Sequence, residues 1–433
     1  MRNYILVILL LMGTFAVAAE LDIDDCWEIL LANNQQLQSE QLGVQSKEAD
    51  VKLSFYDLLP SGSLSGSYNR TGESDLESDN MNYRVSLTQP IYQGGKLVNS
   101  LSQSEKSLLQ SQENYEKLLL TLRFELESKY YNVLKLTESL STVENELSYL
   151  ETNLETAQLR FENGNLSRGD VLQLRSQTAQ KQVALLKAEN SLQIAENELK
   201  NFMVTKENVK PVSLDMEIYN EVISSVSMWQ IAELNEKEQT LLAYALENNP
   251  SLKASEISVE ISEKGMESAK GSFMPSVSLN LSNSWNYQEW DDDPDGNMSL
   301  GLSVSLPIFP VVDNIQKYAK SRYSLRQSEL SLSQEELALE LDMKSALLNL
   351  AAAVQGISAA EISRDYAQES YQQAEENFRN RMITANELLN IQISLTTAEN
   401  ALTNATYDFL GYKGELQNVL GVMDEGELWQ LIR

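Results

Sequence analysis

The sequence contains no histidine and only one cysteine. It therefore lacks the commonest general base and the commonest metal ligand of proteins. The single cysteine, Cys26, cannot form a disulfide within the chain. The residues before it, Ile23-Asp24-Asp25, differ from the apolar and small residues that precede an acylated cysteine. We expect Cys26 to be a small, buried helix residue and not a lipid anchor.

Basic residues are scarce, with 33 Lys and Arg against 63 Asp and Glu, for a formal charge of -30. A surface this acidic repels phosphate backbones, which excludes nucleic acid as a partner. Carboxylates are so abundant that any one pair of them is weak evidence for an exported hydrolase. The sequence also has no nucleophile elbow, zinc-binding histidine motif or P-loop. We expect neither an enzyme nor a cofactor or metal site.

Long apolar runs are missing beyond the N-terminus. Residues 1–19 combine Arg2, a short apolar run and small residues, which predicts a signal peptide cleaved near Ala18 or Ala19. The run is too short to cross about 30 Å of hydrocarbon, and no later stretch offers the roughly 18 to 20 consecutive apolar residues of a spanning helix. The exported chain is therefore periplasmic, secreted or a membrane β-barrel.

The sequence contains an internal repeat. Four short segments recur in the same order at nearly constant spacing: Asn33-Asn34 as Asn248-Asn249, Leu59-Pro60-Ser61 as Met274-Pro275-Ser276, Pro90-Ile91-Tyr92 as Pro307-Ile308-Phe309, and Phe161-Glu162-Asn163 as Phe378-Arg379-Asn380. Such self-similarity indicates a duplicated unit. We expect a first repeat at 20–204, a linking segment of mixed character at 205–238, a second repeat at 239–423 and a tail at 424–433.

Each repeat contains two stretches in which apolar and small polar residues alternate. This period of two is typical of strands with one apolar face, and it predicts β-hairpins at about 61–92 and 276–309. Proline is tolerated at strand ends and is disfavoured inside central strands and helices. Four prolines lie where the strands meet helical sequence: Pro60, Pro90, Pro275 and Pro307.

The rest of the sequence predicts long helices. No glycine or proline interrupts the 68 residues between Gly95 and Gly164, which would extend about 100 Å as a helix. Apolar residues at spacings of three and four form a coiled-coil seam. Its members are Leu147, Leu150, Leu154, Ala157 and Phe161, and in the second repeat Ala367, Tyr371, Ala374 and Phe378. Helices this long must lie against others in an extended bundle or tube.

The strands favour a membrane barrel over a soluble sandwich. Each is close to the roughly 9 to 11 residues that cross a membrane at a tilt. Aromatic residues gather at the strand ends, as in an interfacial girdle: Tyr92 and Phe309 at one level, and Tyr68, Tyr83, Trp285, Tyr287 and Trp290 toward the other. Four strands cannot close a barrel alone, and lipid does not tolerate an open edge, so the chain must oligomerise. The strand count does not choose among dimer, trimer and tetramer.

Two acidic segments, 71–80 and 291–296, lie between the strands of the hairpins. Asp291, Asp293, Asp295 and Gly296 match the start of a calcium-binding EF-hand loop. The position of the bidentate glutamate is Leu302, however, and no helices flank the loop. We expect both segments to be solvated hairpin tips on the same side.

In this order and spacing, the repeated segments closely resemble the TolC-like outer-membrane efflux proteins. The segment 160–172 is similar to the family's helix-turn-helix signature at the periplasmic end, and 21–34 is similar to the start of each repeat. The resemblance covers essentially all of the mature chain. It implies a mixed α+β membrane protein: a homotrimer with a twelve-stranded β-barrel shared between subunits, above a long α-helical coiled-coil barrel that crosses the periplasm. It also implies a periplasmic adaptor protein and an inner-membrane transporter as partners.

The same resemblance suggests two functional sites at the helical tips. Asp170 and Glu387 occupy equivalent places in the two repeats, and acidic residues at this level are associated with the pore aperture in family members. A carboxylate in the first turn of a helix is also favoured by the helix dipole alone, so a capping role is the alternative. Residues around the turn are expected to dock the adaptor: Phe161, Gly164, Leu166, Ser167 and Phe378. For the two phenylalanines, closure of the coiled-coil seam is the equal alternative.

One position departs from the pattern. Arg381 stands where the first repeat has Gly164, and glycine suits a left-handed turn residue. We expect Arg381 either to transfer that conformation to Asn380 or to alter the turn. Ile383 stands where some relatives have a basic residue, so Arg168 or Arg381 would have to supply a closing salt bridge to Asp170. The predicted function is an exit channel of an export system; the alternative is a non-conducting envelope spacer or adhesin.

Overall fold

The computed structural model describes residues 19–71, 78–207, 209–229, 231–288, 295–309 and 311–432. Nearly all of the expected signal peptide, most of the two acidic hairpin tips and Trp290 lie outside these residues. The strands are β1 (Ala19–Leu21), β2 (Ser61–Thr71), β3 (Ser78–Gln93), β4 (Val209–Pro211), β5 (Ser276–Gln288) and β6 (Asp295–Ser305). The helices are α1 (Ile23–Asn33), α2 (Gln35–Tyr56), α3 (Lys96–Glu162), α4 (Arg168–Phe202), α5 (Asn220–Ser227), α6 (Ile231–Asn248), α7 (Pro250–Lys270), α8 (Val311–Arg379), α9 (Ala385–Leu420) and α10 (Glu425–Ile432). Short 3-10 helices span Met216–Tyr219 and Gly271–Phe273.

The chain forms two compact units. Unit 1 draws on Met1–Gln35, Leu119–Ala245 and Glu340–Arg433, and unit 2 on Gln36–Leu118 and Leu246–Leu339. Each unit takes segments from both expected repeats, because the long helices α3 and α8 each contribute to both units. The two compact units therefore do not correspond to the two repeats expected from the sequence. The duplication stays a prediction.

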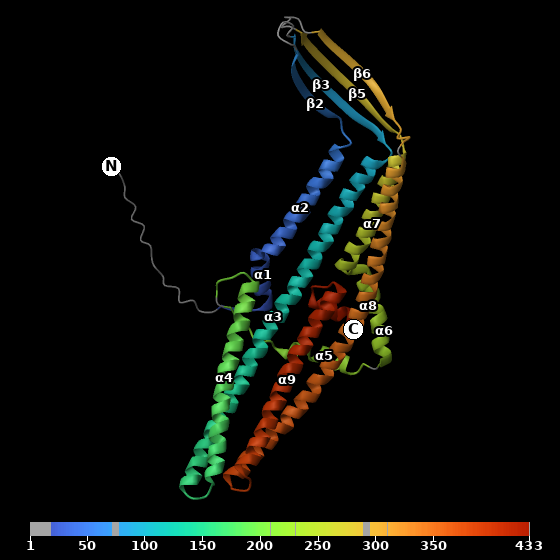
Figure 1. Ribbon diagram of the computed structural model, residues 1–433. Helices are drawn as coiled ribbons and strands as arrows, with labels where there is room; N and C mark the ends of the chain where they lie inside the picture. Colours follow the sequence, from blue (N-terminus) through green and yellow to red (C-terminus); the bar gives the residue numbers. More distant parts are fainter. Residues whose placement is uncertain are drawn as a thin grey trace, which may run out of the picture. The chain divides into compact units, whose positions relative to one another are not determined.

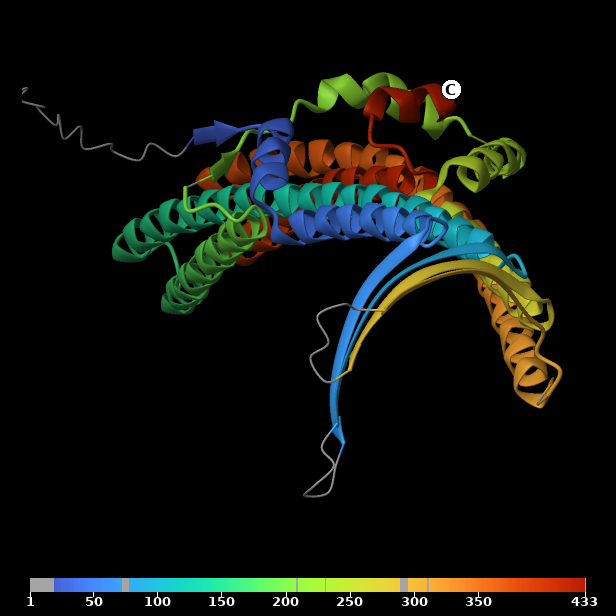
Figure 2. The same ribbon diagram turned by 90° about the horizontal axis from the view of Figure 1, so that it is seen from above.

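Unit 2 contains a four-stranded antiparallel sheet with the order β2-β3-β5-β6. Figure 2 shows the four strands bent together as one curved sheet. The two hairpins match the predicted ones except at one end, where β6 stops at Ser305 and leaves Ile308 outside the strand. Pro307 lies two residues beyond Ser305, and its missing N–H cannot continue the ladder. In contrast, Pro90 lies inside β3, next to a register shift between Pro90 and Tyr92 that accommodates it.

The alternating sequence separates the sheet into two faces. Paired positions such as Leu87, Leu281 and Leu300 share one side, which we call the apolar face, and Ser86, Ser282 and Ser299 share the other, the polar face. The apolar face is uncovered in the described chain, with Leu300 69% and Val304 65% exposed. A soluble sandwich would bury this face against a second sheet.

Aromatic residues on the apolar face gather in adjacent rows, as the sequence predicted. Tyr68, Met81 and Tyr287 form one row of paired positions, and Tyr83 pairs with Trp285 in the next. The rings of Tyr83 and Tyr287 meet edge to face, with centroids 6.0 Å apart. This clustering near the loop ends of the strands fits an aromatic girdle.

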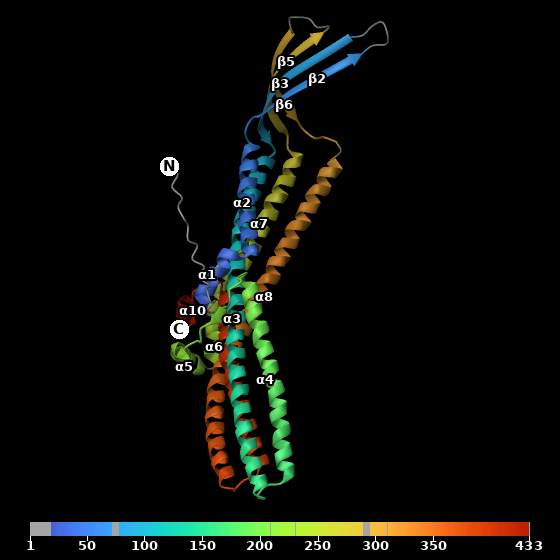
Figure 3. The ribbon, with the colours of Figure 1, turned by 90° about the vertical axis from the view of Figure 1, so that its left-hand side faces the viewer.

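Unit 1 contains two helical hairpins. Helices α3 and α4 run antiparallel and join in a short turn, and α8 and α9 do the same (Figures 1 and 3). Helix α3 begins at Lys96 and ends at Glu162, very close to the boundaries set by Gly95 and Gly164. Near the turns, the hairpins share a core that contains most of the predicted seam. Its buried members include Leu150, Ala157, Val171, Leu174, Tyr371, Ala374, Phe378, Leu388 and Leu389.

Cys26 is fully buried in α1, as the sequence predicted. Burial and the nearby Asp22 and Asp25 carboxylates raise the pKa of its thiol to about 11. Helix α1 follows β1, which pairs in parallel with β4 from the linking segment. The Tyr130 hydroxyl of α3 donates to main-chain oxygens beside both strands, Leu21 O at 3.1 Å and Val212 O at 3.0 Å. This contact fixes the small sheet to the helices of unit 1.

One described helix segment, Val312–Arg379, is long and apolar enough to cross a membrane by length and composition. Its most apolar window is 44% buried inside the structure. Buried core helices pass the same test, and this helix packs against α9 and the other helices of unit 1, so the property fits its place in the bundle.

Candidate functional site

The candidate site comprises the two helical turns of unit 1. In the first, Gly164 has φ +70°, and in the second Arg381 has φ +66°. The main-chain hydrogen bonds are the same in both. Gly164 N donates to Phe161 O and Asn165 N to Arg160 O, at 2.9 and 2.8 Å, while Arg381 N donates to Phe378 O and Met382 N to Asn377 O, at 3.1 and 2.8 Å. Both helices therefore end in the same left-handed cap.

The two outcomes expected for Arg381 are both wrong. The left-handed conformation is neither passed to Asn380 nor lost, because Arg381 adopts it itself and the turn keeps its hydrogen bonds. A residue with a Cβ in this conformation costs roughly 1–2 kcal/mol. In return, two carbonyl groups at the end of α8, Phe378 O and Asn377 O, gain main-chain hydrogen-bond donors. The last carbonyl groups of a helix otherwise have no partner within the helix.

Asp170 and Glu387 lie in the first turns of α4 and α9 and take part in helix capping. The N–H of Asp170 donates to Ser167 Oγ at 3.2 Å, and the Ser167 hydroxyl donates to Asp170 Oδ2 at 2.8 Å. In the second turn, Glu387 N donates to Thr384 Oγ1 at 3.3 Å, and Thr384 N donates to Glu387 Oε2 at 2.7 Å, a complete capping box. The capping alternative therefore has direct contacts in its support.

The capping contacts also set the charge state of Glu387. The main-chain N–H of Thr384, and then its hydroxyl, lower the pKa of the Glu387 carboxyl. Both donors stabilise the ionised form. Glu387, whose side chain is exposed to solvent, therefore stays ionised to a lower pH than an ordinary glutamate.

The two equivalent phenylalanines differ in exposure. Phe161 is 43% exposed, whereas Phe378 is 2% exposed. The guanidinium of Arg160 lies 4.3 Å from the centre of the Phe378 ring, and its Nη2 donates to Phe378 O at 2.7 Å. Burial and the charge of Arg381 lower the pKa of Arg160. The Phe378 ring closes the seam, so of the two rings only Phe161 offers a surface to a partner.

The remaining tip residues occupy different environments. Leu166 is partly buried against the shared core, while Gly164 and Ser167 are exposed. The two turns are joined directly by Gln173, whose Nε2 donates to Asn386 Oδ1 at 2.7 Å. Together with Arg160, this bond holds both turns side by side as one end surface of unit 1. The structure thus brings the predicted site residues together, with Phe378 beneath the surface and the others at or near it.

The comparison with known proteins decides what this arrangement belongs to. A family model described as outer membrane efflux protein matches residues 27–203 and 241–422. These two segments make up most of the sequence. The chain belongs to the outer membrane efflux protein family. Each match begins near the start of an expected repeat.

Two curated relatives agree with the family. The outer membrane protein TolC of Vibrio cholerae is 26% identical over 262 residues, which are 58% of this chain and 57% of that protein. The outer membrane efflux protein BepC of Brucella suis is 22% identical over 284 residues, 64% of this chain and 58% of that protein. The matches therefore span less than two thirds of either relative.

Solved structures show the same fold over nearly the whole chain. A structure of CusC gives a TM-score of 0.82 at 18% identity and covers 95% of this chain and 94% of that one. The outer membrane protein VceC of Vibrio cholerae gives 0.80 at 14% identity, covering 92% and 96%. The MtrE outer membrane channel of Neisseria gonorrhoeae, in its open state, gives 0.77 at 16% identity, covering 92% and 89%. The fold is that of TolC-like channel proteins. As a member of this family, the chain lies in the outer membrane with its helices extending into the periplasm.

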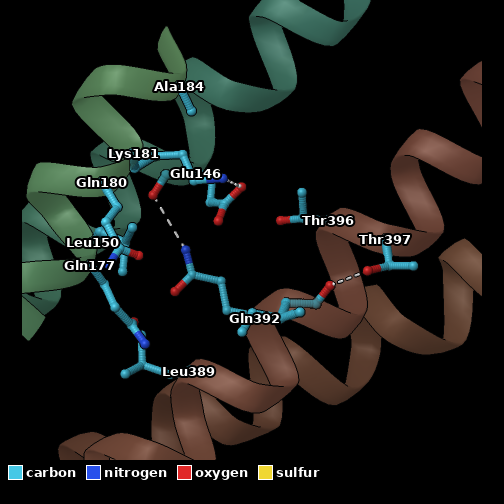
Figure 4. Close-up of a pocket in the computed structure, with 11 residues that line it drawn as sticks. Glu146, Leu150, Gln177, Gln180, Lys181, Ala184, Leu389, Gln392, Thr396 and Thr397 are labelled. Atoms are coloured by element: carbon cyan, nitrogen blue, oxygen red, sulfur yellow. Dashed lines mark hydrogen bonds and ion pairs between the residues drawn. The ribbon is translucent and has the colours of Figure 1, made fainter. Parts of the chain in front are cut away.

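A cavity of about 330 Å³ lies between α3, α4 and α9 (Figure 4). Lys181 Nζ lies 2.7 Å from Glu146 Oε2 at its wall, and Gln392, 2% exposed, donates to Glu146 O at 3.3 Å. The sequence analysis missed these residues. A signal was present, because Glu146 and Lys181 stand about equally far from Gly164 and so face each other across an antiparallel hairpin.

Proposed function

We propose that the chain is one subunit of a trimeric outer-membrane channel, the passive exit duct of a multi-component export system. The observation that carries the proposal is the open sheet of unit 2. Its apolar face is uncovered, and its outer strands, β2 and β6, each pair on one side only within the described chain. Lipid tolerates neither unpaired edge, so the sheet must close with copies of itself.

A trimer would supply twelve strands, enough for a closed barrel. The partners of the proposed system are a periplasmic adaptor and an inner-membrane transporter, with lipid of the outer membrane around the barrel. The cargo consists of small molecules or proteins, and the transporter selects it. No catalytic step is required of this chain, in keeping with its channel-forming relatives.

Detergent extraction followed by planar-bilayer recording tests the proposal. We expect the mature chain to leave membranes only in detergent, to run as a trimer in cross-linking and light scattering, and to conduct ions after reconstitution. A non-conducting spacer or adhesin would give no conductance. A monodisperse monomer that still conducts would contradict the trimer.

The end surface of unit 1 is the proposed docking site for the adaptor. Phe161, Gly164 and Ser167 form its exposed part, and Leu166 supports it from the side. Phe378 acts from beneath, because its buried ring and the Arg160 contact fix the position of the second turn. The adaptor would meet a surface whose shape depends on the left-handed conformation at Gly164.

Gly164→Val should damage the left-handed turn and thereby reduce export, while the barrel still inserts. A β-branched residue is strongly disfavoured at φ +70°, and left-handed backbone costs roughly 1–2 kcal/mol even for ordinary residues. The matched control is Gly164→Asn, since asparagine tolerates this conformation. Drug-resistance or secretion assays would be read beside the amount of trimer in the outer membrane. Equal export by both variants would remove Gly164 from the docking site.

Asp170 and Glu387 are proposed to line the periplasmic aperture in addition to capping α4 and α9. Threefold symmetry would gather the carboxylates of all copies at one constriction, where they favour cations. Asp170→Asn together with Glu387→Gln should lower the cation preference severalfold in single-channel recordings. The control removes two exposed carboxylates elsewhere, Glu189→Gln with Glu361→Gln. If the tip variant matches this control, both residues are helix caps only.

A further inference from the structure

The polar face of the sheet in unit 2 is almost free of charge. Its central positions pair directly across all four strands, as Ser63 with Ser86, Ser86 with Ser282, and Ser282 with Ser299. Small hydroxyl, amide and glycine residues fill this part of the face, with one exception: Ser61, Ser63, Ser65, Ser67, Asn82, Arg84, Ser86, Thr88, Asn280, Ser282, Ser284, Asn286, Asn297, Ser299, Gly301 and Ser303. The exception is Arg84.

Charged residues are rare in strands β2, β3, β5 and β6 and occupy distinct places. Arg70 pairs in register with Asp79 next to the loop end of the first hairpin, and Asp295 is the first residue of β6. Arg84 instead lies in the middle of the ladder, between Ser65 of β2 and Ser284 of β5. Within β2, β3, β5 and β6 as described, it is the one charged side chain that stands away from the loop ends.

Other residues on the polar face bond to one another. The hydroxyls of Ser63 and Ser86 lie 2.8 Å apart, and Thr88 Oγ1 donates to Asn280 Oδ1 at 3.1 Å. Arg84 itself is exposed and has neither an ion pair nor a side-chain hydrogen bond within residues 19–71, 78–207, 209–229, 231–288, 295–309 and 311–432. Its guanidinium therefore keeps all of its donors available to a passing solute.

We propose that Arg84 is a charge-selectivity residue of the barrel lumen, which draws anionic groups of solutes through the outer-membrane part of the duct. The inference rests on the proposed trimeric channel, because only a closed barrel turns the polar face inward and repeats Arg84 around one level. Lipid requires the apolar face outside, so the polar face must line the water-filled interior. The solutes favoured are those that carry carboxylate, phosphate or sulfonate groups.

The expected size follows from elementary electrostatics. Three unit charges, each about one Debye length from the axis at about 0.1 M salt, enrich anions and deplete cations roughly twofold each. The ratio of cation to anion permeability should then change roughly fourfold when the charges are removed. At about 1 M salt the Debye length falls to about 3 Å and the effect should nearly vanish.

Reversal potentials under a potassium chloride gradient test the inference. Arg84→Ser should raise the potassium-to-chloride permeability ratio roughly fourfold at about 0.1 M salt, and Arg84→Glu should raise it further. Arg84→Lys should leave it unchanged. The matched control is Lys52→Ser, which removes the same charge from an exposed site on α2.

A cysteine variant provides a second test in case Arg84→Ser fails to insert into the membrane. Because Cys26 is the only cysteine and is fully buried, Arg84→Cys can be modified selectively with charged thiosulfonate reagents. A cationic adduct should restore the original selectivity, and an anionic adduct should shift it toward cations. If the channel conducts but its selectivity does not change in any of these variants, the role of Arg84 is overturned and the proposed channel stands. An unaltered chain that never conducts would overturn the proposed channel itself.

Discussion

Lys413→Met should lower the free energy of unfolding by about 3–5 kcal/mol, the usual cost of leaving one member of a buried ion pair without its partner. Lys413 lies on α9 in unit 1 and is 1% exposed. Its Nζ lies 2.9 Å from Glu425 Oε2 and 3.9 Å from Glu127 Oε2. Methionine has a similar length but no charge, so Glu425 would lose its cation, while Glu127 would keep only the ion pair of its Oε1 with Arg123 Nε at 2.9 Å.

The same lysine connects three parts of unit 1. It is within reach of α3 through Glu127 and of α10 through Glu425, and its ammonium lies 5.7 Å from the centre of the Tyr219 ring. Glu425 also accepts from Trp429 Nε1 at 3.0 Å. Loss of Lys413 should therefore release the C-terminal helix as well as weaken the bundle.

Circular dichroism of the detergent-extracted protein during denaturation would measure the effect. Lys187→Met removes a lysine from an exposed site on α4 and should change stability by less than about 0.5 kcal/mol. Glu425→Gln added to Lys413→Met should recover part of the loss, because it removes one unpaired charge. Equal stability of the Lys413 and Lys187 variants would refute the buried pair.

The pH dependence has a definite sign. Burial lowers the pKa of Lys413, but the charges of Glu127 and Glu425 outweigh it and raise the pKa above the ordinary value of 10.5. A group whose pKa is raised on folding stabilises the protein fully below its unfolded pKa. The stability difference between the natural chain and Lys413→Met should thus be constant from neutral pH up to about pH 10 and shrink as the pH rises further.

Local sequence patterns predicted the helices and strands. They did not predict contacts between residues that are far apart in the sequence. The boundaries of α3 follow from Gly95 and Gly164, and the two hairpins follow from strict alternation, since both signals are carried by neighbouring residues. The pairing of Lys413 with Glu127 joins residues far apart in the sequence, where no periodicity operates. Sequence reasoning could not single out Lys413 among 33 basic residues.

The sequence also failed to predict part of the candidate site. Equivalent positions in the two repeats predicted equal roles for Phe161 and Phe378, yet one is exposed and the other is buried. Phe378 packs into the core that the two hairpins share, and Arg160 covers its ring and donates to its main-chain oxygen. Likewise, the helix-end hydrogen bonds hold Arg381 in a conformation that its residue type disfavours. The burial of Phe378 depends on packing between the hairpins, and the conformation of Arg381 depends on the main-chain hydrogen bonds that end α8; one-dimensional patterns contain neither.

Gly271→Ala should destabilise unit 2 by about 1–3 kcal/mol and reduce the amount of folded sheet, because two backbones cross without room for a side chain. Gly271 ends α7 just before β5, and Gly94 follows β3 just before α3. A Cβ added to Gly271 would overlap the carbonyl oxygen of Gly94, and one added to Gly94 would overlap that of Gly271. Since both obstacles are main-chain atoms, no side-chain rotation relieves them.

Gly94→Ala should be at least as harmful. Gly94 has φ +64°, so alanine there adds the strain of left-handed backbone, roughly 1–2 kcal/mol, to the overlap. The matched control is Gly43→Ala in α2, where an added Cβ meets nothing within 4 Å. That change should stabilise the helix by roughly 0.5–1 kcal/mol. Thermal unfolding in detergent and protease resistance of the barrel in whole cells would rank the three variants. If Gly271→Ala and Gly43→Ala were equally stable, the close approach of Gly94 and Gly271 would not require glycine at position 271.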